Sequence, residues 1–275
     1  MKKIVLITIL SVLRLFAQTD AADSTAYSQD KDTIYDSKIH LTLGWFIPNI
    51  TTSAQLNSST GRTGATINLE STFNLPTTKQ LFRFEGLYRF NNTSSVDFYY
   101  YLLNRSGSNI STDSLNFGNI VIPVDASLES HFNMSLFGSR YYYSFVNNQN
   151  FEAGLSAGLS FLNIDMGALV TLNNKTAEET YKDLLFLPVI GFYNRFKLGE
   201  RFTFRDRVNL FALDIDRYNG ILIDLSFSLE YLIFKNLAAG AAFSVFTLDV
   251  TFDAKKSGRI QYGQRGIYIF ASLKL

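Results

Sequence analysis

The chain has two histidines, His40 and His131, which are the side chains best suited to acid–base chemistry near neutral pH. His131 stands two residues after Glu129 and four residues before Ser135. In a β-strand, side chains two residues apart point to the same face, so these three groups would lie side by side. A histidine between a serine and an acid can activate the serine hydroxyl for acyl transfer. The spacing matches no hydrolase or acyltransferase motif, and we favour a polar histidine in the interior of the fold, without catalysis.

Charged side chains of both signs recur on the polar face of segments whose other face is apolar. In the segment 219–234, Asp224 and Glu230 alternate with apolar side chains that run from Ile221 to Ile233. Charges in a fold interior must pair or contact water, so we expect a network there. The predicted members are Arg83, Glu85, Arg89, Asp97, Arg195, Arg201, Arg205, Arg207, Asp224 and Glu230. Two interpretations are open: a structural network, or the lining of a narrow channel whose selectivity these charges tune.

Metal, cofactor and nucleic-acid chemistry have no support in the sequence. There is no cysteine, the two histidines are far apart, and no acidic run has the spacing of a calcium loop. The glycines lack the strand-to-helix context of a phosphate-binding loop. The net charge is +1, which gives no reason to expect a nucleic-acid partner. We therefore predict no cofactor, no metal and no nucleic acid.

The elements that carry these residues show a period of two along most of the chain. Such alternation, with 47% apolar and only 18% charged residues, predicts an all-β protein. The run 219–234 is much longer than the five or six residues usual for a strand, and a tilted membrane-crossing strand needs about 9–11. We predict an antiparallel up-and-down transmembrane β-barrel of about 10 strands (8–12). The candidate strands are 38–49, 62–74, 80–91, 95–105, 128–147, 150–172, 182–198, 201–215, 219–234, 237–254 and 262–275.

Eleven candidates conflict with the even strand number of such barrels. If 62–74 belongs to a long excursion, the count is ten, which we prefer; if 117–126 is an added strand, it is twelve. Short turns are expected near 91–94, 147–150, 199–200 and 235–236, and longer links near 106–127, 173–181, 215–219 and 254–261. Asp206 interrupts the apolar face of its strand, which predicts a bulge or a register change there.

The N-terminus has the order of a secretory signal. Met1-Lys2-Lys3 is basic, 4–16 is apolar, and small residues follow at Ala17 and Ala21. The apolar run is too short for a membrane-spanning helix of about 20 residues. We predict a signal peptide over 1–21, a flexible segment over 22–37 and the barrel over 38–275.

The signal, the amphipathic strands, the short turns and the terminal strand GIYIFASLKL together resemble small bacterial outer-membrane β-barrel proteins of the OmpA- and OmpW-like kind. The stretches GRTGATINLESTFNL (61–75) and LFRFEGLYRFN (81–91) are similar to segments of bacterial outer-membrane proteins. The resemblance implies a monomer in outer-membrane lipid. The alternation of short turns and longer links predicts a C-terminus in the periplasm. The resemblance also implies that the barrel-assembly machinery recognises the strand from Ile267 to Leu275. Terminal strands of such proteins usually end in Phe or Trp, and Leu275 departs from that pattern.

Three functions remain open at this stage. The first is a non-catalytic outer-membrane barrel with a structural, adhesive or small-solute role. The second is a narrow porin-like channel for small or apolar molecules. The third is an outer-membrane enzyme that modifies lipid through His131.

Overall fold

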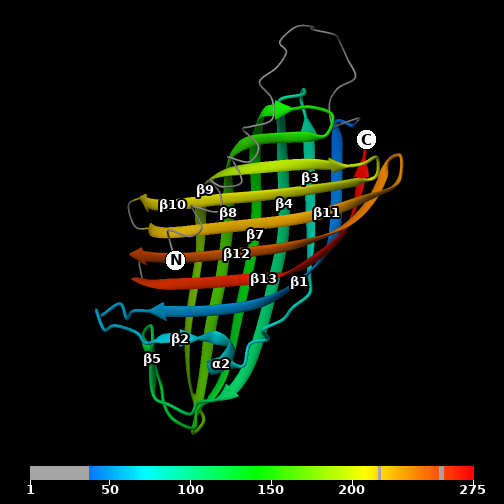
Figure 1. Cartoon of the computed structure of the whole chain (residues 1–275). Coiled ribbons are helices and arrows are strands. Elements are labelled where there is room, and N and C mark those ends of the chain that lie inside the picture. Colours follow the sequence, from blue (N-terminus) through cyan, green and yellow to red (C-terminus); the bar gives the residue numbers. More distant parts are fainter. Residues whose placement is uncertain (1–36, 216–217, 254–256) are drawn as a thin grey trace, which may run out of the picture. The chain divides into compact units, whose positions relative to one another are not determined.

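The computed structural model describes residues 37–215, 218–253 and 257–275, so the predicted signal peptide and nearly all of the segment 22–37 lie outside the described residues. Ten long strands pair antiparallel in chain order, and the last strand pairs with the first (Figure 1). The closing register runs from His40 opposite Lys274 to Leu56 opposite Gly258. The barrel strands are β1 (Ile39–Leu56), β3 (Leu81–Arg89), β4 (Ser94–Ile110), β7 (Ser127–Asn147), β8 (Phe151–Leu172), β9 (Lys175–Leu198), β10 (Phe202–Ile215), β11 (Tyr218–Phe234), β12 (Leu237–Asp253) and β13 (Ser257–Lys274). The predicted ten-strand antiparallel barrel is confirmed.

The two segments that left the strand count open do not cross the barrel wall. Residues 62–74 hold the short strand β2 (Thr66–Asn68) and the helix α2 (Leu69–Phe73), and β2 pairs with the far end of β1. Asn68 caps α2 by accepting a hydrogen bond from the Ser71 amide, and Asn74 ends it in the left-handed conformation. Residues 115–122 form a separate hairpin of β5 (Leu115–Phe117) and β6 (Ile120–Ile122). Ten strands therefore close the barrel.

The barrel has one end with short turns and one with longer excursions. The short turns lie at 90–93, 148–150, 199–201 and 235–236, at the end where β1 begins and β13 ends. The excursions 57–80 and 111–126 lie at the opposite end (Figure 1). The predicted long link at 173–181 is wrong, because β8 and β9 are joined by only Asn173 and Asn174, whose φ angles are 50° and 62°. Two positive φ values are typical of a tight hairpin turn, and the polar strand ends were mistaken for a loop.

β8 reverses its polarity part-way along its length. Near the short-turn end its inward side chains are polar, as at Glu152 and Ser160, and its outward ones are apolar, as at Leu155. Beyond residue 161 the inward positions carry buried apolar side chains such as Ile164, and the outward positions carry polar ones such as Asp165. The inner wall is therefore polar in one half of the barrel and apolar in the other.

The half with the polar interior carries an exposed apolar belt. On β1 this belt runs from Ile39 to Ile47, followed by polar Asn49 and Thr51. Eight strand rises at ~3.3 Å, tilted by ~40°, make about 20 Å of height, close to the ~25 Å apolar band of outer-membrane barrels. No helix among the described residues has the length and apolarity needed to cross a membrane.

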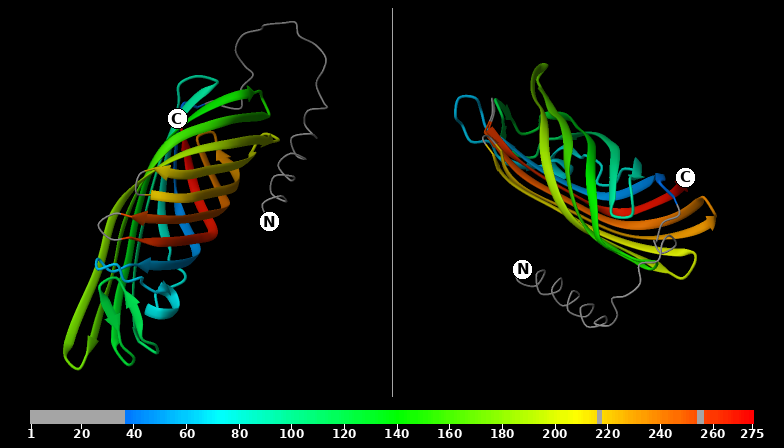
Figure 2. Two further views of the ribbon diagram at one scale, coloured as in Figure 1. Left: turned by 90° about the vertical axis from the view of Figure 1, so that its left-hand side faces the viewer. Right: turned by 90° about the horizontal axis from the view of Figure 1, so that it is seen from above.

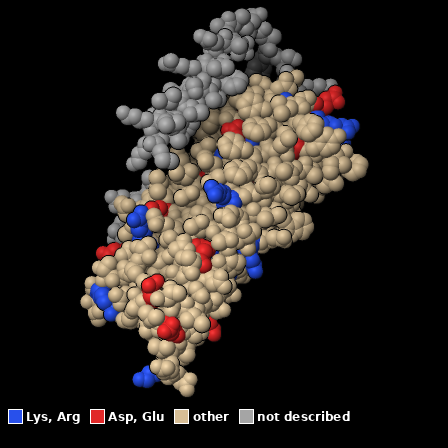
Figure 3. All heavy atoms as spheres, turned by 60° about the horizontal axis from the view of Figure 1, so that its bottom comes forward, with Lys and Arg blue, Asp and Glu red and all other residues tan. Residues whose placement is uncertain are grey.

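The other half projects beyond the belt as an extension with its own apolar core. Leu69 and Phe73 of α2, with Phe117 and Ile122 of the β5–β6 hairpin, are buried among apolar side chains of the barrel wall. Figure 2 shows β7, β8 and β9 reaching far into this extension. Charged side chains are scattered over the outer surface of this end (Figure 3). The structure thus joins a membrane-type barrel to a water-exposed barrel through continuous strands.

The predicted bulge or register change at Asp206 is wrong. β10 pairs in unbroken register with both neighbours, and Asp206 lies opposite Asn194 of β9. The alternation places both side chains on the outer face, where the Asn194 amide donates to Asp206 Oδ2 at 2.9 Å. The polar residue therefore breaks the apolar belt without breaking the strand, because a partner on the neighbouring strand satisfies it.

Candidate functional site

The lumen inside the apolar belt holds two layers of charged side chains. In the upper layer, nearer the extension, Arg140 Nη2 donates to Asp97 Oδ2 at 2.6 Å, and the Tyr142 hydroxyl donates to the same oxygen at 2.8 Å. The Arg140 guanidinium also lies 4.2 Å from the centre of the Tyr99 ring. Arg83 Nε lies 2.7 Å from Glu85 Oε1. The Arg140–Asp97 contacts join β7 to β4 by charge-assisted hydrogen bonds, whereas the Arg83–Glu85 pair lies within β3.

The lower layer lies nearer the end of the barrel that carries the short turns. Glu230 is contacted by Arg205 Nη2 at 2.8 Å and by Lys274 Nζ at 2.5 Å. Glu152, which is fully buried, lies 3.3 Å from Arg89 Nη2 and accepts a hydrogen bond from Ser144 at 2.5 Å. The Arg89–Glu152 contact links β3 to β8, and the Lys274–Glu230 contact links β13 to β11. Neither pair of strands is adjacent in the sheet, so the layer braces the barrel from inside.

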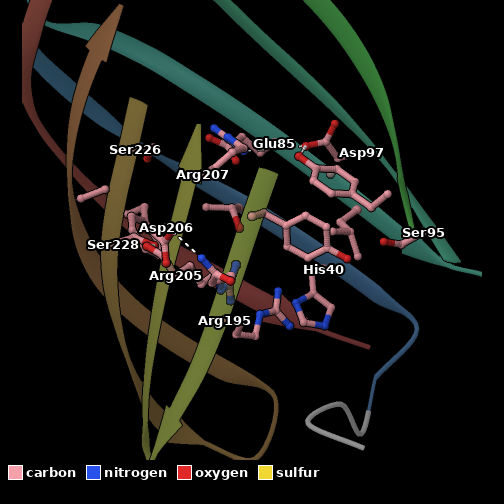
Figure 4. Close-up of a pocket in the computed structure, with 18 of the residues that line it drawn as sticks. His40, Glu85, Ser95, Asp97, Arg195, Arg205, Asp206, Arg207, Ser226 and Ser228 are labelled. Atoms are coloured by element: carbon pink, nitrogen blue, oxygen red, sulfur yellow. Dashed lines mark hydrogen bonds and ion pairs between the residues drawn. The ribbon is translucent and has the colours of Figure 1, made fainter. Parts of the chain in front are cut away.

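A cavity lies between the two layers and has about 120 Å³ of space for the centres of water molecules. Figure 4 shows side chains from β1, β3, β4, β9, β10 and β11 around it, with Arg195, Arg205 and Arg207 among them. A second cavity of about 20 Å³ lies next to Arg83 and Arg140. Charged and aromatic side chains thus fill most of the lumen between the two cavities.

One buried charge pair anchors the excursion 57–80 to the wall of the extension. Arg105 Nη1 donates to Glu70 Oε1 of α2 at 2.6 Å, and Nη2 donates to the Thr52 hydroxyl at 2.5 Å. The Thr52 amide donates to the other Glu70 oxygen at 2.8 Å. On the opposite side, the Asn119 amide of the β5–β6 hairpin donates to Glu179 of β9 at 3.0 Å. We call residues 57–80 and 111–126 together the plug.

The structure places all of the predicted network residues inside the lumen except one. Arg201 precedes β10, lies exposed in the turn 199–201 and donates to the outward-facing Tyr231 hydroxyl at 3.1 Å. The alternation rule fails there because the residue lies outside the strand. Sequence reasoning missed Arg140 and Lys274, although each falls on the inward parity of a strand that it had identified.

The three candidate catalytic residues lie on the outer surface of the extension. The prediction of an interior position for His131 is wrong, because the buried side of this part of β7 is the apolar one, with Leu128 and Phe132. His131 Nε2 lies 3.1 Å from Asp165, and Ser135 and Glu129 have no contact with the ring in the part of the chain that the structure describes. Acyl transfer requires a nucleophile hydrogen-bonded to its base, and Ser135 and His131 do not make that contact within the described residues.

Asp165 holds the centre of this surface cluster. Lys182 Nζ lies 3.0 Å from its carboxylate, on the side away from His131. Partial burial opposes ionisation, but the hydrogen bonds from Lys182 and His131 outweigh it and hold the pKa of Asp165 below its usual range. The other histidine, His40, is buried in the lower lumen with its Nε2 2.7 Å from the Ser37 hydroxyl.

Metal binding finds no group of ligands here. Within residues 37–215, 218–253 and 257–275, no three His, Cys, Asp or Glu side chains come together in a way that could hold an ion.

Comparison with known proteins identifies the fold. No protein-family model matches the chain, and no curated protein matches it in sequence. The outer membrane protease OmpT of Escherichia coli matches in structure with a TM-score of 0.58 at 10% identity, over 90% of this chain and 99% of OmpT. The translocator domain of the autotransporter NalP from Neisseria meningitidis has a TM-score of 0.46 at 7% identity, over 100% of this chain and 98% of that domain. Ail of Yersinia pestis has a TM-score of 0.31 at 8% identity, over 86% of this chain and 99% of Ail. This chain has the fold of an outer-membrane β-barrel protein.

Proposed function

We propose that this protein is a non-conducting outer-membrane barrel that displays a rigid extension on the cell surface, in a structural or adhesive role. The observation that carries the proposal is the plug. Its apolar side chains complete the core of the extension, and the buried Arg105–Glu70 pair fixes it to the wall. A barrel of ten strands is wide enough for a narrow passage only if its interior is left unfilled.

The proposal also assigns a direction to the barrel. Short turns are typical of the periplasmic end of outer-membrane barrels, and longer connections are typical of the outside. The extension and its plug would then face the medium, and Lys274 would lie at the periplasmic end. Outer-membrane lipid would surround the apolar belt, and the assembly machinery would recognise the strand from Ile267 to Leu275.

Labelling of single cysteines tests the direction, since the chain contains none. Arg62→Cys lies in the plug excursion and Lys235→Cys lies in a short turn, and both positions are exposed. A membrane-impermeant maleimide applied to intact cells should label the first variant and leave the second unlabelled. Heat-modifiable migration on a gel should accompany outer-membrane fractionation, because folded barrels resist detergent. Labelling of Lys235→Cys alone would reverse the proposed direction.

Conductance in planar bilayers tests the closed lumen. The unmodified protein should give no reproducible single-channel steps. Steps from the unmodified protein would contradict the proposal and favour the porin-like channel.

The lipid-modifying alternative depends on His131 alone. It predicts that His131→Ala changes the lipid profile seen by mass spectrometry. Among the described residues the ring contacts the acid Asp165 and no nucleophile, so we expect an unchanged profile.

A further inference from the structure

The seam between β9 and β10 is shorter than the two strands that form it. β9 pairs with β8 along almost its whole length, in a register that ends with Lys175 opposite Leu172. On its other side β9 pairs with β10 only as far as Ile190 opposite Leu210. β10 runs on past Leu210, but there it pairs with β11 alone among the described strands. Residues 181–189 of β9 therefore form an unpaired strand edge within the described chain, which we call the β9 edge.

Alternate residues of the β9 edge direct their backbone groups away from β8. Pro188 has no N–H, and a proline in a sheet lies where its nitrogen faces away from the ladder. The Leu184 amide, on the same parity, donates to the Asp183 carboxylate at 2.9 Å. On the other parity, the Lys197 amide donates towards β8, to the Asn150 carbonyl at 2.7 Å. Even-numbered residues of the edge therefore turn their N–H and C=O groups to its open side.

Two amides of the β9 edge, those of Lys182 and Phe186, have no acceptor among the residues that the structure describes. The outer side chains of β9 are apolar from Phe192 up to Leu184, and Lys182 is the first charged one above them. Phe186 is 56% exposed on this apolar surface. Lipid has no group that can bond to a backbone amide, so an open edge at this depth is costly. Such an edge is a template for another strand.

A small apolar cavity lies on the inner side of the β9 edge. It is lined by Leu185 and Leu187 of β9, Phe211 of β10 and Val250 of β12, and it has about 20 Å³ of space for the centres of water molecules. One water needs about 10–15 Å³ of such space, so the cavity fits a group of roughly the size of a methyl. An added strand turns every second side chain inward, and a small apolar side chain would enter this cavity.

The orientation of the barrel argues against a second copy of this chain at the edge. Two copies inserted in the same direction are related by rotation about the membrane normal, so their β9 strands run in the same direction. Pairing between them would be parallel, which is less stable per residue than antiparallel pairing. A separate extended segment has no such restriction and can run antiparallel to β9.

We propose that the β9 edge binds an extended polypeptide segment of a partner protein by β-strand addition. Backbone hydrogen bonds to Lys182 and Phe186 supply affinity, and a small apolar side chain in the cavity supplies specificity. The side chains that the added strand turns outward beside Phe186 are apolar, because they face lipid. The proposal does not rest on the closed lumen or on the plug. Since the edge lies in the wall, a barrel that conducts could carry it as well.

Binding of a fluorescent synthetic peptide to the full folded protein in lipid nanodiscs tests the proposal. The probe alternates valine and threonine, and the control probe has proline in place of every threonine. Fluorescence anisotropy should show saturable binding of the first peptide and no binding of the second. Phe186→Pro removes one edge amide and should weaken binding about tenfold, whereas Phe186→Leu keeps that amide and should change binding less than about twofold. Pro188 shows that this edge accommodates a proline.

A second pair of variants, Lys182→Pro and Lys182→Ala, repeats the comparison above the belt, and heat-modifiable migration verifies that each variant is folded. Amide hydrogen exchange gives an independent readout. The bound peptide should slow exchange of the Lys182 amide at least about tenfold and leave that of Leu185, which faces β8, unchanged. The proposal is overturned if the alternating peptide does not bind saturably, or if the proline variants bind it as tightly as their controls. Dimers in native mass spectrometry that disappear in Phe186→Pro would assign the edge to a second copy and overturn it as well.

Discussion

Arg105 should be the most sensitive single residue of the plug. Its side chain is fully buried in the extension and is the cation that contacts Glu70 of α2. It also donates to Thr52 on β1 and to the Pro76 carbonyl at 3.2 Å. Arg105→Met keeps the length and the apolar stem of the side chain and removes all of these donors. The carboxylate of Glu70 is then left buried without its counter-ion.

The magnitude follows from the geometry of the pair. Two charges whose centres are ~4 Å apart attract by about 4 kcal/mol at an effective dielectric constant of ~20. Loss of one partner of a buried pair generally costs about 3–5 kcal/mol, which agrees with that value. Since ~1.4 kcal/mol is a factor of ten, undocking of the plug should become roughly 1000-fold more frequent. The excursion 57–80 carries this effect, because it holds Glu70 and Pro76.

Hydrogen–deuterium exchange of the folded protein measures this opening directly. Amides over 66–76 should exchange much faster in Arg105→Met, while those of β11 stay protected. Arg105→Met with Glu70→Met should restore most of the protection, because an apolar pair of similar volume is close to neutral. Arg259→Met is the matched control: its pair with Asp249 is exposed, and such pairs contribute at most about 1 kcal/mol. Unchanged exchange in Arg105→Met would refute the anchoring role of the pair.

Three further predictions concern the wall of the barrel. Gly138→Ala should lower the free energy of unfolding by about 1–3 kcal/mol in urea titrations, because a Cβ there would lie 2.2 Å from the Tyr99 ring. Gly263→Ala is the control, because its Cβ would meet only the Thr51 carbonyl oxygen at 4.0 Å, an ordinary contact distance. The pKa of Asp165 is lowered in the folded protein, so this carboxylate should stabilise the fold above its ordinary pKa of 3.8 and lose that contribution as the pH falls through the lower folded value. Asp165→Asn should remove this part of the pH dependence of the unfolding free energy. An unaltered pH profile in that variant would contradict the prediction. Asp206→Leu should raise the free energy of unfolding in lipid vesicles by about 1 kcal/mol, because it replaces a polar side chain in the apolar belt. A loss of stability in this variant would argue against a lipid-facing position.

Strands inside the belt could be predicted almost residue by residue. In β11 the inward side chains Leu222, Asp224 and Glu230 and the outward side chains Phe227 and Leu229 follow the alternation as expected. A period of two fixes the two faces of a strand, and in the belt lipid requires the apolar one outside. Because of that requirement, most of the charged side chains of the lumen could be predicted from the sequence.

Above the belt, in the extension, the same rule assigned the wrong face of the strand to the interior. The alternation around Leu128 and His131 was correct, but it does not say which face points inward. In the extension the outside faces water and the inside packs on the plug, so the apolar face points inward and the polar face outward. The plug itself could not be predicted, because its excursions show no alternation of polar and apolar residues. The cross-strand neighbours of Arg195 were also hidden, because Glu152 and Arg205 come to lie opposite it only through the register of β8, β9 and β10.

Because the polarity of single strands reverses along their length, the two ends of the molecule can bind different kinds of partner. The extension has an apolar core, and its outer surface carries the polar cluster of His131, Asp165 and Lys182, where partners can bind. The lower lumen has a polar cavity of about 120 Å³ lined by Arg195 and Arg207, which has room for a small solute. The upper charge layer and the plug separate the two regions. A small ligand should therefore reach the lumen from the short-turn end, while contacts on the extension leave the lumen unaffected.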